Sequence, residues 1–317
     1  MNPTAPPAEQ QDFVYALALS PNFEQDGLCF AARQSGLYRS HDGGQCWQFA
    51  YQSLNLTEAL TTTSVLFSPD FVGDRAVFAG VPGGILRSAN GGESWQVALL
   101  GSPPPAVSAL VISPDFRRDG VLLAGTVEDG IYRSADRGHR WAAWNFGLLD
   151  LRVLCLAISP HFAADEIVFA GTESGLFRST NGGRAWREVA LPIGFEPVLS
   201  LALSPNFEAD GALFVGTEQG LFYSSDRGQS WLRRGEDELA GDINLILLSP
   251  NFAAEPSLVV LGDNTPYISA DWGQSWQPYP ADNTGEPEIA TIAAPYGVGL
   301  EHPLMLSFVN GEVRIPA

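Results

Sequence analysis

The sequence contains no lysine, so all 17 of its basic residues are arginine, and they are outnumbered by 36 acidic residues. The formal net charge of −19 argues against binding to the phosphate backbone of nucleic acids, because that binding needs clustered basic charge. No apolar run approaches the roughly 18 residues that a membrane-spanning helix requires. The first residues also lack a basic stretch followed by an apolar run. We therefore expect a cytoplasmic protein with no nucleic-acid partner and no direct insertion into membranes.

The sequence is also poor in residues that bind metals or form disulfides. Its three cysteines are Cys29, Cys46 and Cys155, an odd count whose spacing fits no disulfide framework and no zinc motif. We expect Cys29 and Cys155 to be small core residues, because each lies in an apolar run. The four histidines show no metal-ligand spacing, and no Ser/His/Asp set or phosphate-binding glycine loop stands out. The sequence therefore predicts no cofactor, no metal and no catalytic residue.

One eight-residue motif, Ser-x-Asp/Asn-x-Gly-x-x-Trp, occurs six times along the chain. The Asp or Asn side chain accepts hydrogen bonds from nearby backbone N–H groups and fixes a tight turn. The glycine provides a backbone angle with φ > 0 at little steric cost. We expect the tryptophan ring to be largely buried against a neighbouring sheet. The copies begin at Ser40, Ser88, Ser134, Ser179, Ser224 and Ser269 and end at Trp47, Trp95, Trp141, Trp186, Trp231 and Trp276.

A second motif, Ser-Pro-x-Phe-x-x-Asp, keeps step with the first. Its prolines, together with Pro295 in a decayed seventh copy, are 45 to 48 residues apart. A period in the forties is typical of β-propeller blades made of four short strands. The copies are Ser20–Asp26, Ser68–Asp74, Ser113–Asp119, Ser159–Asp165, Ser204–Asp210 and, with Glu at its end, Ser249–Glu255.

Each repeat predicts four short antiparallel strands, named A to D from a central channel outward. Seven A strands begin near Phe13, Thr63, Val107, Val153, Val198, Ile243 and Ile289, but only six tryptophan motifs follow them. We therefore predict an all-β fold, a seven-bladed β-propeller of four-stranded antiparallel blades whose last blade is closed by the N-terminal segment, near residues 4–11. A three-stranded last blade with a loose N-terminal tail is the alternative. Residues 1–12 form the tail or closing strand, and 13–317 form a single propeller domain.

The tryptophan motif resembles the Asp-box, or bacterial neuraminidase repeat, which joins the outer strands of propeller blades. Sialidases carry it too, but their Arg-Ile-Pro motif precedes the boxes, whereas here the same tripeptide at 314–316 follows all six. The compact ring and strands such as Gly36–Ser40, which reads Gly-Leu-Tyr-Arg-Ser, are most similar to the photosystem II stability and assembly factor family. That resemblance implies a non-catalytic seven-bladed propeller that holds membrane-protein subunits during assembly.

The two faces of the predicted ring differ in how much they vary between blades. A–B and C–D turns share one face and carry the repeated motifs, which the fold itself explains. B–C turns and D-to-A connections share the other face, where variable loops and carboxylates would suit a basic partner. The candidate binding residues on that face are Arg33, Glu128, Asp129, Asp150, Arg152, Glu173, Glu196, Glu218, Asp242, Asp263 and Glu286.

These observations favour a monomeric, non-catalytic scaffold that mediates protein–protein interaction or complex assembly. The alternative is a carbohydrate-active protein, a glycoside hydrolase or lectin, that binds a glycan through acidic residues of the propeller mouth. A structural ring with a bound cation is a third hypothesis. We interpret the arginines that precede the box serine as structural groups that pair with a box carboxylate or stack on the tryptophan. The alternative is that they form an arginine patch that recognises a protein partner. These arginines are Arg39, Arg87, Arg133 and Arg178.

Overall fold

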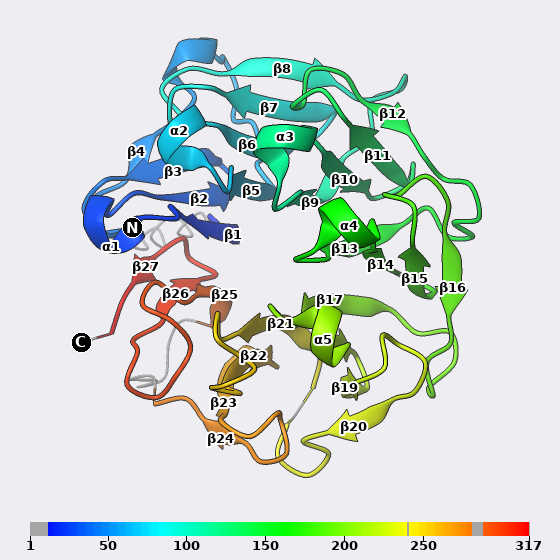
Figure 1. Ribbon diagram of the computed structural model, residues 1–317. Helices are drawn as coiled ribbons and strands as arrows, with labels where there is room; N and C mark the ends of the chain where they lie inside the picture. Colours follow the sequence, from blue (N-terminus) through cyan, green and yellow to red (C-terminus); the bar gives the residue numbers. More distant parts are fainter. Residues whose placement is uncertain (1–11, 240, 281–287, 317) are drawn as a thin grey trace, which may run out of the picture.

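The computed structural model of the chain describes residues 12–239, 241–280 and 288–316. Seven antiparallel sheets are arranged in a ring, like the blades of a propeller (Figure 1). Six sheets have four strands in chain order, and the seventh has three strands within the described residues. The prediction of an all-β seven-bladed propeller is confirmed. The predicted closing strand near residues 4–11 lies outside the described residues and stays a prediction.

The strands have the following bounds. Blade 1 contains β1 (Val14–Leu19), β2 (Cys29–Arg33), β3 (Gly36–Ser40) and β4 (Gln48–Phe49), and blade 2 contains β5 (Ser64–Phe67), β6 (Val77–Val81), β7 (Gly84–Ser88) and β8 (Gln96–Leu99). Blade 3 contains β9 (Val107–Ile112), β10 (Leu122–Thr126), β11 (Ile131–Ser134) and β12 (Ala142–Ala143), and blade 4 contains β13 (Val153–Ile158), β14 (Val168–Thr172), β15 (Gly175–Ser179) and β16 (Arg187–Val189). Blade 5 contains β17 (Val198–Leu203), β18 (Leu213–Thr217), β19 (Gly220–Ser224) and β20 (Leu232–Arg234), and blade 6 contains β21 (Ile243–Leu248), β22 (Leu258–Gly262), β23 (Thr265–Ser269) and β24 (Gln277–Pro278). Blade 7 contains β25 (Ile289–Ala293), β26 (Met305–Phe308) and β27 (Val313–Arg314). Each inner strand begins within one residue of its predicted start.

The Ser-Pro-x-Phe-x-x-Asp motif forms the A–B turn of each blade. In blade 1 the Ser20 hydroxyl donates to Asp26 Oδ2 at 2.7 Å, and Asp26 Oδ1 accepts the Leu28 N–H at 2.9 Å. The motif phenylalanine is buried and packs on the preceding blade, as Phe116 does against Phe78 with ring centroids 5.6 Å apart. One-turn helices occupy five of these turns, namely α1 (Phe23–Asp26), α2 (Phe71–Asp74), α3 (Phe116–Asp119), α4 (Phe162–Asp165) and α5 (Phe207–Asp210).

The only other helical turn in the described ranges is the 3-10 turn η1 (Gln52–Leu54), in the connection from blade 1 to blade 2. In the described part of the chain, no helix has the length and hydropathy that a membrane span requires.

The Asp-box forms the C–D turn through the hydrogen bonds that its sequence predicts. Asp42 Oδ1 accepts the backbone N–H groups of Gln45 and Cys46 at 3.0 and 2.8 Å. The box glycine is required where the backbone meets the preceding blade: at Gly92, with φ of +85°, an added Cβ would lie 2.4 Å from Phe30 Cζ. The same turn therefore reverses the chain and brings adjacent blades into contact.

Three of the box tryptophans, Trp95, Trp186 and Trp231, bond to the preceding blade. The indole N–H of Trp95 donates to the carbonyl of Ala50, at the end of the preceding blade, at 3.0 Å. Trp231 makes the same bond to Ala190, also at 3.0 Å. Burial varies more than predicted, because the D strands lie at the outer edge of the ring. Three of the rings are buried (Trp95, Trp186 and Trp276), and the other three are partly buried (Trp47, Trp141 and Trp231).

The arginines before the box serine also bridge blades, but to a different acceptor from the one predicted. Arg39 Nη1 donates to the carbonyl of Gly91 at 3.1 Å, and Arg178 Nη1 donates to that of Arg227 at 3.0 Å. Both carbonyls occupy the same position in the next blade's Asp-box. These two arginines therefore have a structural role, as predicted. However, each side chain reaches the backbone of the next blade and bonds to a carbonyl there, and not to a box carboxylate or the tryptophan ring.

Candidate functional site

Backbone hydrogen bonds assign the turns to two faces of the ring. On one face, A–B turns bond to C–D turns of the same blade, as the Gly43 N–H does to the Gly27 carbonyl at 3.0 Å. On the other, B–C turns bond to D-to-A connections, as the Glu173 N–H does to the Arg152 carbonyl at 3.2 Å. The assignment of turns to faces therefore agrees with the structure. In Figure 1 the A–B helices α2 to α5 lie around the inner part of the ring.

Five of the predicted site residues gather in the loops of blades 3 and 4. The Gly130 N–H, in the B–C turn of blade 3, donates to the Leu151 carbonyl in the connection to blade 4 at 2.9 Å. Within this region Arg152 pairs with Asp150, with Nε 3.5 Å from Oδ1, and also with Glu173. The Tyr132 hydroxyl donates to Asp129. Glu128 is exposed at the tip of the same turn.

Two ionisable side chains of this region, Tyr132 and Asp150, have shifted pKa values. Burial, together with the hydrogen bond to Asp129 and the negative charge of Asp129, raises the pKa of Tyr132 to about 12, so the phenol stays protonated. Burial works against ionisation of Asp150, but hydrogen bonding from the Arg152 backbone N–H and the nearby Arg152 charge leave the pKa of Asp150 below its ordinary value. Fixed charges of this kind suit recognition of a charged partner.

Arg33 lies apart from that group and is largely enclosed. Its guanidinium lies 3.6 Å from Asp12 Oδ2 with the side chain 12% exposed, and it stacks over the rings of Tyr38 and Trp47 at 4.7 and 5.5 Å. Burial lowers the pKa of Arg33, which the nearby Asp12 carboxylate partly opposes. These contacts leave little of the guanidinium for a ligand.

The remaining predicted residues are spread around the ring. Glu218, Asp242 and Asp263 are exposed, and Glu196 is partly exposed. Within the described ranges none of these four carboxylates makes an ion pair. Glu286 lies outside the described residues. The predicted set is therefore one local group in blades 3 and 4 and several separate carboxylates.

Exposed apolar side chains accompany the blade 3 and 4 group, and charge-based reasoning missed them. Phe146 is 82% exposed and Leu149 is 77% exposed, both in the connection from β12 to β13. The backbone under Phe146 is fixed, because its carbonyl accepts the Trp186 N–H at 2.8 Å. A rigid loop thus presents an aromatic ring to solvent. The signal in the sequence was an apolar cluster, Trp-Asn-Phe-Gly-Leu-Leu at 144–149, in a connection that the repeat does not explain.

One family model matches the chain over residues 9–146, and its description is photosynthesis system II assembly factor YCF48. The chain is a seven-bladed propeller, and its residues 9–146 are similar to the YCF48 family. The expected resemblance is thereby confirmed. No curated protein gave a significant sequence match.

Solved structures share the fold of this propeller at low identity. YCF48 from Cyanidioschyzon merolae is 14% identical, with a TM-score of 0.66, and the match covers 97% of this chain and 96% of that one. A YCF48 structure described as bound to a D1 peptide is 18% identical, with a TM-score of 0.66 and coverage of 93% and 89%. The GH74 xyloglucanase from Xanthomonas campestris is 18% identical, with a TM-score of 0.70 and coverage of 95% and 51%.

The chain is much shorter than several of the proteins that it resembles. It spans between 38% and 51% of the length of the four longer structures that it matches, which include two GH74 proteins. At these identities the likeness establishes the fold and carries no activity over to this chain.

Proposed function

We propose that this chain is a non-catalytic scaffold that binds a protein partner through the loops of blades 3 and 4. The blade-3/4 surface is defined as Val127, Glu128, Phe146, Leu149, Asp150, Arg152 and Glu173. The observation that carries the proposal is Phe146, an 82% exposed ring on a backbone fixed by Trp186. Apolar anchors on a rigid frame with a charged rim are typical of protein interaction sites.

Two further observations support a protein partner. A structure with the same fold, YCF48, is described as bound to a D1 peptide. The rim of the blade-3/4 surface carries more carboxylates than arginines, and the whole chain has a net charge of −19. A partner that presents an apolar side chain flanked by lysine or arginine would match both the ring and the rim.

The absence of lysine makes a sharp cross-linking test possible. A carbodiimide couples carboxylates to amines, and this chain offers no lysine amine for coupling within itself or between copies. Purified chain is mixed with an extract of its native cells, and the coupled products are identified by mass spectrometry. We expect coupling through Glu128 or Glu173, and we expect it to weaken as salt rises, because exposed charges are screened.

Matched variants then test the face. Phe146→Ser is expected to reduce partner coupling about tenfold, as loss of a central aromatic anchor does. Val72→Ser serves as the control, because Val72 is 67% exposed in α2 on the opposite face. Replacing Glu128, Glu173 and Glu218 together by arginine should weaken partner binding in a pull-down in a salt-dependent way, while leaving the melting temperature nearly unchanged. If only the Val72 variant loses coupling, the partner binds the opposite face and our proposal is wrong. If the purified chain hydrolyses xyloglucan, the glycoside hydrolase is favoured instead.

A further inference from the structure

The seventh A–B turn departs from the repeat and leaves space at one side of the channel. In the first six blades the motif phenylalanine is buried at this turn (Phe23, Phe71, Phe116, Phe162, Phe207 and Phe252). Residues 294–297 read Ala-Pro-Tyr-Gly, so Gly297 takes the place of the phenylalanine. A Cβ added at Gly297 would meet only His302, at 3.9 Å. The blade therefore lacks the ring that fills this position elsewhere.

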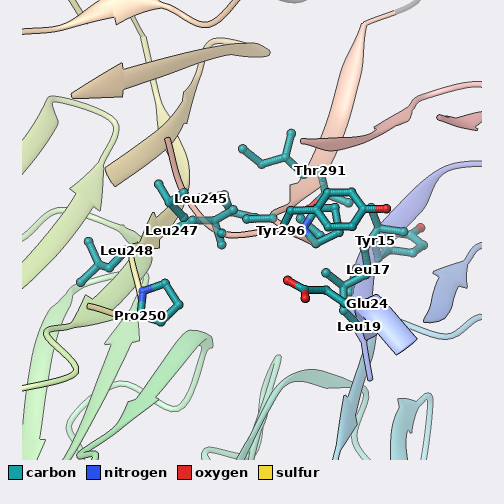
Figure 2. A pocket seen from close by; sticks show the side chains of 17 residues that line it. Tyr15, Leu17, Leu19, Glu24, Leu245, Leu247, Leu248, Pro250, Thr291 and Tyr296 are labelled. Carbon is teal, nitrogen blue, oxygen red and sulfur yellow. The ribbon is translucent and has the colours of Figure 1, made fainter. Parts of the chain in front are cut away.

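A cavity of about 680 Å³ lies at this place, between β1, β21 and β25. Figure 2 shows Leu245 and Leu247 on one side and Leu17 and Leu19 on the other, with the ring of Tyr296 between them. A volume of this size suits a small ligand or a short stretch of chain, and apolar walls favour one that has an apolar body. The lining includes residues of A–B turns, such as Glu24 and Pro250, and none of the residues of the blade-3/4 surface.

Two tyrosines in the cavity are not explained by the repeat, and one carboxylate accompanies them. Tyr15 and Tyr296 are each 41% exposed. Counted back from the Ser-Pro pair, the residues that correspond to Tyr15 in blades 2 to 6 are Thr63, Ser108, Leu154, Leu199 and Asn244, none of them aromatic. Glu24 is the one charged residue among the described residues that line the cavity. Figure 2 shows its carboxylate pointing into the space between the two walls.

These groups define the chemistry of a ligand. The leucine walls favour removal of an apolar chain from water. The phenol rings and the Glu24 carboxylate both attract a cation. Within the described residues Glu24 makes no ion pair, so its charge is free to meet one. We propose that the cavity binds an apolar chain that carries an ammonium or guanidinium group. Such a chain is found in a free alkylamine and in a lysine or arginine within an apolar peptide segment.

The test compares three probes that share one apolar chain and differ in head charge: n-octylammonium, n-octanol and octanoate. Binding to the purified full chain is measured by isothermal titration calorimetry at pH 7 and low salt. Octylammonium is expected to bind about fivefold more tightly than octanol, as a partly exposed cation beside a carboxylate and an aromatic ring should. Octanoate is expected to bind more weakly than octanol, because its charge matches that of Glu24.

Two charge-matched variants show whether the preference belongs to this cavity. Glu24→Gln should abolish the preference for octylammonium and keep the affinity for octanol. Glu208→Gln is the control, because Glu208 follows the motif phenylalanine of α5 as Glu24 follows that of α1, and it does not line the cavity. Equal affinities of the wild type for octylammonium and octanol would refute the proposal, as would an equal loss of preference in both variants.

A fourth probe separates the two sources of the ligand. The blocked peptide acetyl-Leu-Leu-Lys-Leu-Leu-amide carries the same ammonium on an apolar polypeptide. Tighter binding of the peptide than of octylammonium, lost in Glu24→Gln, assigns the site to a segment of a partner protein. Weaker binding assigns it to a free amine. Because the cavity and the blade-3/4 surface share no residue, failure here leaves the outcome of the Phe146 experiment unaffected.

Discussion

Replacing Trp95 by alanine tests whether the box tryptophans hold the blades together. The Trp95 ring is 6% exposed and lies edge-on to Phe30 and Tyr51, with centroids 6.3 and 5.6 Å away. Its indole N–H also donates to the Ala50 carbonyl at 3.0 Å. Loss of a buried aromatic of this size costs about 3–5 kcal/mol of unfolding free energy. The carbonyl left without its donor adds to that cost.

Trp144 provides a control of the same residue type. It lies outside the boxes and its side chain is 38% exposed, so Trp144→Ala should cost roughly 1 kcal/mol or less. Urea unfolding followed by far-ultraviolet circular dichroism avoids the change in tryptophan fluorescence that both variants share. The midpoint of unfolding should fall clearly for Trp95→Ala, with little change for Trp144→Ala. If the two variants unfold within 1 kcal/mol of each other, the box tryptophan is not the inter-blade anchor that we describe.

Three further predictions concern the boxes and the last blade. Hydrogen bonds, chiefly from the Cys46 N–H to Asp42 and from the Ser230 hydroxyl to Asp226, lower both aspartate pKa values to about 2 from 3.8. The contribution of these two carboxylates to stability is therefore present above pH 3.8 and lost as the pH falls toward 2. Between pH 4 and pH 2, the Asp42→Asn/Asp226→Asn variant should therefore lose less stability than the wild type. Arg39→Ala should cost about 1–2 kcal/mol in urea unfolding, because it removes the donor of an inter-blade hydrogen bond, whereas Arg140→Ala, at an exposed position, should cost almost nothing. Deleting residues 1–11 should lower the melting temperature if they supply the predicted fourth strand of blade 7, and an unchanged melting temperature favours the loose-tail alternative.

The ring could be predicted from the sequence because its determinants are local. Each box turn depends on hydrogen bonds within five residues, such as those that Asp42 accepts from Gln45 and Cys46. Two boxes carry Asn90 or Asn181 in place of the aspartate and form the same turn, because the amide oxygen accepts equally well. Repeated about every 45 residues, such turns fix the number of blades before any contact between blades is known.

Contacts between blades could not be predicted in the same way. The acceptor of Arg39 is a carbonyl 52 residues away, and no spacing rule within one repeat points to it. Arg33 looked like a free cation on a variable turn, yet Asp12 and two aromatic rings enclose it. The candidate site was found only in part: the carboxylates of blades 3 and 4 were visible in the sequence, while the exposure of Phe146 depends on how its loop bonds to blade 4.

The irregular features of the chain meet at the seam between the last blade and the first. Terminal units of a repeat array are atypical, because each lacks the neighbour that the inner units share. Trp47 faces that seam, and its buried indole N–H has no acceptor among the described residues, unlike the indole N–H of Trp95. Arg33 stacks over the Trp47 ring there, where no other blade places an arginine against its box tryptophan in the described contacts. Gly297 leaves the channel open on the same seam. A seam that the repeat does not complete is therefore free to acquire residues for binding, and the cavity that holds Glu24 lies at that seam.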